Sequence, residues 1–165
     1  FTRFLCGPAD YTPCYFNGKV KNTKAHQLAM PVVYYSPITF LFWYDLPNVY
    51  KGEKELDFWK YCPTVWDESK ALQGEIGEYI VQARRSGNDW FVGAMNGLQA
   101  RDITLNTADF LQKGKKYRVE IYNDVPALNT RTKVSTVVQT IKAGKILKLH
   151  LQSSGGAALR FSLLK

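Results

Sequence analysis

The stretch that decides the fold reads Glu78-Tyr-Ile-Val-Gln-Ala-Arg-Arg85, then Ser86-Gly-Asn-Asp89, then Trp90-Phe-Val-Gly-Ala94. Its first segment puts apolar residues on one face and polar residues on the other, with Tyr79, Val81 and Ala83 alternating with Gln82 and Arg84. This period of two is typical of a half-buried strand. Residues 86–89 are small or polar, so the stretch predicts an antiparallel β-hairpin with a four-residue loop.

Five further segments downstream of this hairpin are typical of strands, at residues 102–106, 115–122, 134–141, 146–152 and 157–163. In residues 146–152, three leucines alternate with Lys148 and His150, so one face of that strand contacts water. Seven short strands separated by polar turns predict an antiparallel β-sandwich over residues 76–165.

The first 75 residues show a different pattern of apolar and polar residues. Short apolar runs at residues 1–6 and 63–67 are typical of strands, and residues 53–60 are typical of a short helix. Thr23 is a suitable cap for a helix that begins near Lys24. Residues 28–44 contain no charge, but Pro31 and Pro37 interrupt them and they are shorter than the ~20 residues of a membrane span. We therefore expect a buried helix here and no membrane span.

The order strand, helix, strand predicts one βαβ unit of a parallel sheet. A single unit cannot bury its own sheet, and a complete (β/α)₈ barrel needs about 250 residues. The sequence therefore predicts an α+β fragment, with residues 1–75 as the last β-α-β portion of a (β/α)₈ barrel and residues 76–165 as a carboxy-terminal antiparallel β-sandwich. We expect the chain to be a truncation or cleavage product, with open strand edges that pair with a second chain as a dimer.

The net charge of +8 raises the question of nucleic-acid binding. The basic residues are scattered over turns and alternating strand positions and form no long run, so we expect no nucleic-acid partner. The cysteines Cys6, Cys14 and Cys62 lack metal-ligand spacing, and an odd number leaves at least one thiol free.

Several motifs, in order along the chain, resemble glycoside hydrolase family 97. Phe1-Thr-Arg-Phe4 with Gly7-Pro-Ala-Asp-Tyr-Thr-Pro13 resembles a late barrel strand and its loop, and His26-Gln-Leu-Ala-Met-Pro-Val-Val33 with Ser36-Pro37 resembles the next helix. Pro63-Thr-Val-Trp-Asp-Glu-Ser69 resembles the last barrel strand, and Gly77-Glu-Tyr-Ile-Val81 resembles the start of the carboxy-terminal sandwich. The sequence departs from the family pattern at Cys14, Pro31 and Tyr35.

The resemblance implies a longer secreted or periplasmic enzyme with an amino-terminal β-super-sandwich, a catalytic (β/α)₈ barrel and this carboxy-terminal sandwich. It implies hydrolysis of α-linked glucosides or galactosides, so an oligosaccharide is the expected substrate of the whole enzyme. One branch inverts and uses calcium, and the other retains through a carboxylate nucleophile. The resemblance places the catalytic groups and calcium ligands before Phe1. We therefore expect this fragment to bind no metal, to carry no catalytic residue and to be inactive alone.

Four residues are nevertheless candidates for lining the sugar site of the whole enzyme: Asp10, Tyr11, Trp66 and Asp67. They lie in the loop after the first predicted strand or at the end of the second, and active sites of such barrels lie at the carboxyl ends of the strands. Carboxylates also make strong hydrogen bonds to hydroxyl-rich ligands. The alternative interpretation is structural, with Asp10 holding the Gly-Pro loop and Trp66 in the core.

A second functional hypothesis is a carbohydrate-binding β-sandwich module without hydrolytic activity. Such a module would stack sugars on exposed aromatic side chains, for which Trp90, Phe91 and Tyr122 are the candidates. Most of these aromatics fall on apolar faces or within hairpins, which favours the structural interpretation over this one.

Overall fold

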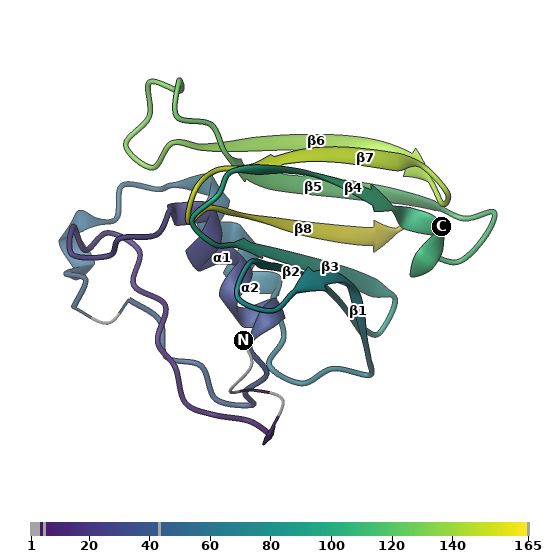
Figure 1. Cartoon of the computed structure of the whole chain (residues 1–165), viewed down its shortest axis with the longest axis horizontal. Coiled ribbons are helices and arrows are strands. Elements are labelled where there is room, and N and C mark those ends of the chain that lie inside the picture. Colours follow the sequence, from purple (N-terminus) through teal and green to yellow (C-terminus); the bar gives the residue numbers. More distant parts are fainter. Residues whose placement is uncertain (1–3, 5, 43, 165) are drawn as a thin grey trace.

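The computed structural model describes residues 4, 6–42 and 44–164 (Figure 1). Short helices occupy the first part of the chain: α1 (Lys24–Val33), η2 (Pro47–Val49), η3 (Lys54–Leu56) and α2 (Asp57–Tyr61). Strands follow: β1 (Glu68–Glu75), β2 (Tyr79–Ser86), β3 (Asp89–Asn96), β4 (Arg101–Asn106), β5 (Lys116–Asp124), β6 (Val134–Lys142), β7 (Ile146–Leu151) and β8 (Gly156–Leu163), with the short helix η4 (Thr107–Asp109) after β4. The fold is therefore α+β and mostly antiparallel sheet.

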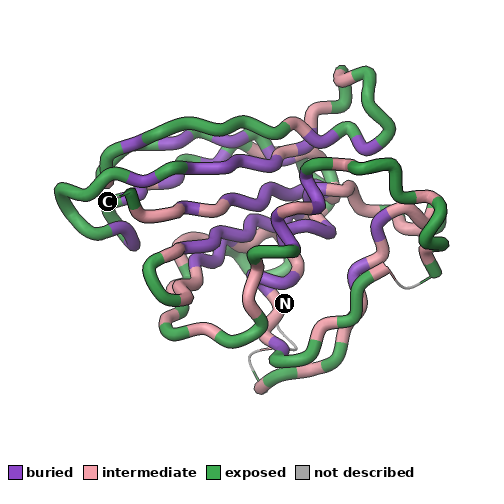
Figure 2. The backbone as a smooth tube through the Cα atoms, turned by 180° about the vertical axis from the view of Figure 1, so that it is seen from behind, coloured by how far each residue is buried: buried purple, intermediate pink, exposed green. Residues whose placement is uncertain are grey.

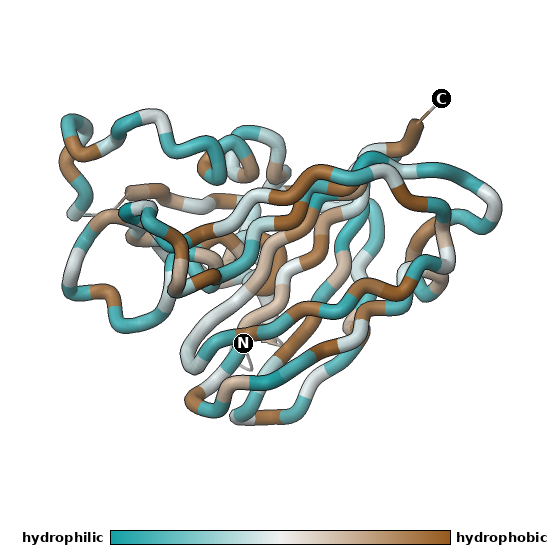
Figure 3. Tube along the Cα trace, turned by 90° about the horizontal axis from the view of Figure 1, so that it is seen from above, coloured by the Kyte–Doolittle hydropathy of each residue, from teal (hydrophilic) through white to brown (hydrophobic). Residues whose placement is uncertain are grey.

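Two sheets build the molecule, and all strand pairs that the structure describes are antiparallel. The larger sheet has six strands in the order β1-β2-β3-β8-β5-β6, and the smaller pairs β4 with β7. The smaller sheet covers one face of the larger through a core that includes Val92, Leu105 and Leu149. Helix α1 covers the opposite face, so the six-stranded sheet is the middle layer (Figure 1). Figure 3 shows the hydrophobic and hydrophilic residues alternating along the strands.

All seven predicted strands are present, within a few residues of their expected ends. The sandwich prediction is confirmed only in part, because its second sheet has two strands and a helix occupies the other face of the main sheet. The predicted four-residue hairpin loop is wrong. Ser86 pairs with Asp89, which leaves a two-residue loop, and Gly87 adopts the positive φ of 57° that such a tight turn requires.

Strand β1 was not predicted. Its side chains on the half-buried face include Glu68 and Lys70, so charge falls where an inward-facing strand position is normally apolar. Lys70 places its ammonium 5.4 Å from the centre of the Trp90 ring and an oxygen of Glu68 3.2 Å away, which compensates for partial burial.

Helix α1 begins at the predicted residue, and the Thr23 hydroxyl accepts a hydrogen bond from the His26 amide as its cap. The helix ends at Val33, so the expectation of a helix through most of residues 28–44 is wrong. Pro37 disfavours helical backbone at the residue before it, and residues 35–42 form no helix or strand.

The predicted βαβ unit is not formed among the described residues. Helix 53–60 is confirmed as η3 and α2, but residues 63–67 form no strand. Their one described backbone hydrogen bond to a strand runs from the Asp67 amide to the Arg85 carbonyl. The strand predicted at residues 1–6 lies largely outside the described residues; Phe4 and Cys6 are in a 3₁₀ turn. A parallel strand needs parallel neighbours to complete its hydrogen bonds, whereas every strand pair among the described residues is antiparallel.

Small residues let α1 lie directly on the sheet. A Cβ added to Gly93 of β3 would lie 2.8 Å from the Ala29 carbonyl oxygen and 2.9 Å from Cβ of Val32. A Cβ added to Gly156 of β8 would lie 2.7 Å from Cα of His26. The Arg84 guanidinium of β2 donates to the Val32 carbonyl at 2.5 Å, which satisfies the carboxyl end of α1.

Buried Asp124 fixes the other end of α1. Its carboxylate accepts hydrogen bonds from the Thr23 hydroxyl at 2.5 Å, the Ala25 amide at 3.1 Å and the Gly156 amide at 3.0 Å. Burial raises the pKa of this carboxyl, and these three hydrogen bonds partly oppose the increase. One side chain thus joins β5, β8 and the amino end of the helix.

The buried ring of His26 leads us to expect that the fold is less stable in acid. Its Nδ1 lies 3.0 Å from the Gly155 carbonyl, to which the neutral ring donates, and burial lowers the pKa of the ring. The unfolded chain therefore binds a proton at this ring more readily than the folded one. The contribution of His26 to the free energy of unfolding is complete above about pH 6.5, and it decreases as the pH falls below that value. Urea unfolding of the wild type and His26→Gln should show a smaller loss between pH 7.5 and 5.5 in the variant. Equal losses in the two proteins would contradict this assignment.

Candidate functional site

The acidic side chains of the first part of the chain mostly hold the fold together. The Asp45 carboxylate accepts from the amides of Tyr15 and Phe16 at 2.7 and 3.0 Å. The Tyr15 hydroxyl donates to buried Glu55 at 3.3 Å. The remaining carboxylates of this part with charged partners form the pairs Glu53–Arg131, Asp57–Lys60, Asp67–Arg85, Glu68–Arg85 and Glu68–Lys70. These groups are occupied by structural contacts.

Clefts on the described surface lack the carboxyl pair that glycoside hydrolysis uses. Three clefts have volumes of about 520, 370 and 240 Å³, and each is lined by a single acidic residue: Asp124, Asp45 and Glu78, respectively. Glycosidases place two carboxyl groups about 5–9.5 Å apart across the scissile bond. The geometry therefore offers no acid–base pair in these three clefts.

Two of the predicted sugar-site residues lie in the loop before α1. Asp10 is exposed. Tyr11 is half-buried, with its ring edge-on to Tyr34 at 5.4 Å and its hydroxyl 3.3 Å from Oγ1 of Thr39. Burial raises the pKa of the Tyr11 hydroxyl, so this group is a neutral hydrogen-bonding group at physiological pH.

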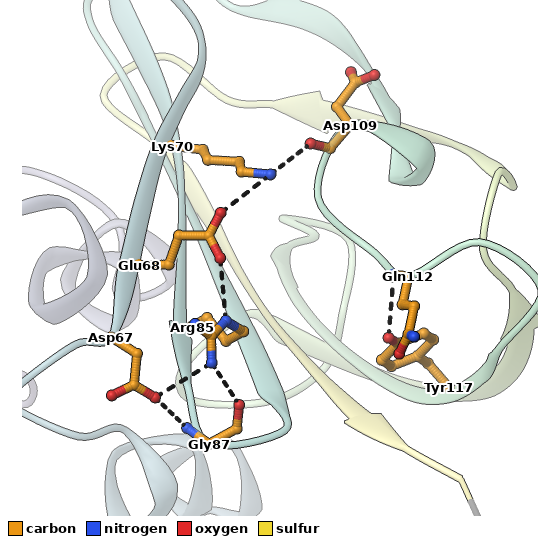
Figure 4. Close-up of polar contacts among 8 residues, drawn as sticks. All are labelled: Asp67, Glu68, Lys70, Arg85, Gly87, Asp109, Gln112 and Tyr117. Atoms are coloured by element: carbon orange, nitrogen blue, oxygen red, sulfur yellow. Dashed lines mark hydrogen bonds and ion pairs between the residues drawn. The ribbon is translucent and has the colours of Figure 1, made fainter.

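The other two predicted residues lie beside the β2–β3 hairpin. The Trp66 ring packs edge-on against Phe91 with centroids 5.5 Å apart. Asp67 accepts from the Gly87 amide at 2.7 Å and pairs with Arg85 at 3.4 Å (Figure 4). No described contact joins Tyr11 to Trp66 or Asp67. The role of all four residues in sugar binding stays a prediction.

The Asp67 contact belongs to a larger polar network along β1 and β2 (Figure 4). Nε of Arg85 donates to Glu68 at 3.2 Å, and Nζ of Lys70 bonds to the Asp109 carbonyl at 3.3 Å. The hydrogen bond from Arg85 lowers the pKa of the Glu68 carboxyl. The network joins β1 to the hairpin turn and to the segment after β4, which is a structural task.

The aromatic platform required by the carbohydrate-binding hypothesis is not present at the candidate residues. Trp90, Phe91 and Tyr122 are 5%, 2% and 3% exposed. Trp90 points into the core between the sheets, whereas Phe91 and Tyr122 contact the layer that contains α1 and α2. The alternative hypothesis of a carbohydrate-binding module therefore loses these three candidates, because both faces of the main sheet are covered where they lie.

The strongest surface feature is apolar and was not predicted. Large apolar or aromatic side chains between residues 38 and 65 are 40–78% exposed: Ile38, Phe40, Leu41, Tyr44, Leu46, Tyr50, Tyr61 and Val65. We call this the apolar surface of residues 38–65; Figure 2 shows much of this segment exposed. It includes the cleft of about 370 Å³, whose walls include Phe42, Pro47 and Trp59. Leu41, Leu46 and Tyr50 line this cleft together, and exposed apolar side chains gathered in this way mark an interaction surface. The uncharged run at residues 28–44, for which the sequence predicts a buried helix, signals only the first part of this surface.

No helix in the described part of the chain has the length and apolar character needed to cross a membrane. The same residues contain no group of three or more His, Cys, Asp or Glu side chains that could hold a metal ion. Cys6, Cys14 and Cys62 are all free thiols, consistent with the odd cysteine count.

Comparison with known proteins supplies the family. The family model described as "Glycosyl-hydrolase 97 C-terminal, oligomerisation" matches residues 65–162. The chain is 38% identical, over 97% of its length, to the curated "Retaining alpha-galactosidase" of Bacteroides thetaiotaomicron, of which it covers 26%.

Solved structures agree. A glycoside hydrolase family 97 enzyme in complex with acarbose, from Pseudoalteromonas sp. strain K8, superposes with a TM-score of 0.87 at 36% identity, covering 99% of this chain and 27% of that enzyme. A beta-arabinopyranosidase superposes with a TM-score of 0.68 at 27% identity, over 85% of this chain and 21% of its own length. The chain thus spans about a quarter of the length of these relatives. It belongs to glycoside hydrolase family 97 and carries the carboxy-terminal oligomerisation domain of that family.

Proposed function

We propose that this chain is the non-catalytic end of a longer α-galactosidase or α-glucosidase and packs against the catalytic part through the apolar surface of residues 38–65. The observation that carries the proposal is that surface, with Leu46 at 64% and Val65 at 63% exposure. Apolar groups of this size are stabilised by removal from water, and the relatives are about four times longer than this chain. The partner that we propose is the preceding (β/α)₈ barrel, which would cover these apolar side chains.

The substrate proposal follows from the relative named a retaining alpha-galactosidase. We infer that the whole protein hydrolyses α-galactosides, or α-glucosides as the second choice, through two carboxyl groups that lie before Phe1. Asp10, Tyr11, Trp66 and Asp67 remain candidates for contacting the sugar once the barrel is present. We also propose a periplasmic or secreted location for the whole enzyme.

Calcium is the metal that the family resemblance implies for an inverting enzyme. The residues described here do not fit it, because no group of three or more potential ligands occurs among them. Hard cations such as calcium take six to eight oxygen ligands. If the whole enzyme uses calcium, we propose that residues outside this chain hold it.

An activity assay tests the proposal directly. The 165-residue chain, confirmed as folded by circular dichroism, should give no turnover of nitrophenyl α-galactoside or nitrophenyl α-glucoside above the rate in buffer. The longer protein that contains this chain should hydrolyse at least one of them. Turnover by the purified 165-residue chain alone would overturn the non-catalytic assignment.

The proposed packing against the catalytic part can be tested separately. Leu46→Glu in the longer protein should lower its melting temperature, because a charge replaces an apolar contact with the catalytic part. The matched control is Leu98→Glu, since Leu98 is 80% exposed and lies outside the apolar surface. Equal melting temperatures for these two variants would contradict the proposed packing.

A further inference from the structure

Strand β6 is an edge strand whose middle residues are exposed on both faces. Its only strand partner among the described residues is β5. The five consecutive residues 136–140 are all exposed, and Val137 and Val138 are 48% and 52% exposed on opposite faces. Figure 2 shows this exposed stretch beside strands that are largely buried. The middle of β6 therefore extends beyond both layers that cover the main sheet.

The two edges of the main sheet differ in their protection. Edge strands are normally blocked against pairing by charged side chains, proline or a β-bulge. Strand β1 carries Glu68, Lys70 and Glu75 and has a register shift between Ala71 and Gln73. Strand β6 contains neither proline nor glycine, its register with β5 is regular over nine residues, and its one charged residue is Lys142 at the end. Of the two edge strands, only β1 has the features that normally block pairing with another strand.

The sequence of β6 is also suited to pairing with itself. An antiparallel pair about a two-fold axis at Val138 would keep all nine residues of each copy paired. It would place Val138 opposite Val138, Thr136 opposite Thr140 and Val137 opposite Gln139. Opposed threonines and β-branched residues are favourable cross-strand pairs, and no two like charges would meet. A two-fold interface requires such self-complementarity.

We propose that a second copy of this chain pairs antiparallel along β6, with Val138 at the two-fold axis, and joins two six-stranded sheets into one. The partner is the same chain because the edge is self-complementary and because the matching family model is described as an oligomerisation domain. The inference identifies the strand through which that family role is carried out. It depends neither on the packing of the apolar surface of residues 38–65 nor on the whole protein's activity.

Sedimentation equilibrium of the 165-residue chain tests the proposal. The wild type should dimerise reversibly, and Val138→Lys should raise the dissociation constant at least about tenfold, because two ammonium groups would meet at the axis. Val138 is 52% exposed in the single chain, so the lysine ammonium can reach water and the monomer should stay folded. Val138→Thr, uncharged and β-branched, should retain the dimer. Circular dichroism on all three proteins separates lost dimerisation from lost folding.

Two further variants identify which surface joins the copies. Ala71→Lys adds the same charge to the exposed β1 edge, and Leu46→Glu alters the apolar surface; both should leave the dimer intact. Hydrogen exchange should show amides in 136–140 gaining protection as protein concentration rises. A wild type that stays monomeric, or a dimer that survives Val138→Lys but dissociates in either other variant, would overturn the β6 assignment. None of these outcomes bears on the activity assay of the longer protein, which tests the proposed function independently.

Discussion

Asp124→Ala is expected to lower the free energy of unfolding by about 2–4 kcal/mol, measured by urea denaturation at pH 7. The carboxylate is buried and accepts hydrogen bonds from the Thr23 hydroxyl and from the amides of Ala25 and Gly156. Removing it leaves three donors in a site that alanine cannot satisfy, and a buried donor without a partner costs about 1–3 kcal/mol. Relief from burying a charge offsets part of this loss.

The matched control is Asp102→Ala. Asp102 also pairs with one side chain, His150, but its side chain is 86% exposed. Exposed pairs contribute about 0–1 kcal/mol, so this variant should unfold close to the wild type. A loss for Asp124→Ala no larger than that of Asp102→Ala would show that the contacts of Asp124 do not fix α1 on the sheet.

Gly93→Ala is expected to lower the free energy of unfolding by about 1–3 kcal/mol, and Gly93→Val by more. The added Cβ would lie within 3 Å of the Ala29 carbonyl oxygen and of Cβ of Val32. Backbone and branched side chain cannot move aside without lifting α1 off β3. The lost packing between helix and sheet then outweighs the small gain that alanine gives a strand over glycine.

Gly18→Ala is the control for this substitution. A Cβ at Gly18 has no atom within 4 Å, and its φ lies outside the positive range. Its free energy of unfolding should differ by no more than about 0.5 kcal/mol from the wild type. If Gly93→Ala behaves in the same way under thermal and urea unfolding, α1 does not lie as close to β3 as described.

The strands were predictable from sequence because their signal is local. Leu147 and Leu149 in β7 alternate with polar residues, and this alternation matches a buried and an exposed face. Val119 and Ile121 in β5 alternate with charged residues in the same way, although Glu120 is buried as well. Strand β1 escaped prediction because Glu68 and Lys70 occupy its inward face. Their burial is made possible by Arg85 and by the Trp90 ring, which are far from them in sequence.

The amino-terminal part was predicted less well for a related reason. Apolar composition at residues 28–44 is compatible with a buried helix, a strand or an exposed interaction surface, because composition alone does not say which faces meet water. The helix ends at Val33, and side chains such as Phe40 and Leu46 are exposed. In the same way, residues 63–67 form no strand, and of this stretch only the Asp67 amide bonds to the backbone of β2.

In the candidate site, too, some features were predicted from the sequence and others are known only from the structure. The sequence drew attention to Asp67 as an acid at the end of an apolar run, but the structure shows what it contacts, the Gly87 amide and Arg85. The odd number of cysteines required a free thiol without any knowledge of the fold. The exposure of the apolar surface of residues 38–65 could be known only from coordinates.

The sequence by itself determined the antiparallel strands from Tyr79 onward and the family, because both depend on short patterns and ordered motifs. Tertiary structure decided the order of the strands, with β8 between β3 and β5, and the position of α1 across them. It also decided which edge is open for pairing. These features depend on contacts between distant residues, such as Thr23 and Asp124, which are 101 positions apart. No local period encodes such a contact, because it forms only when the strands on both sides of it have packed.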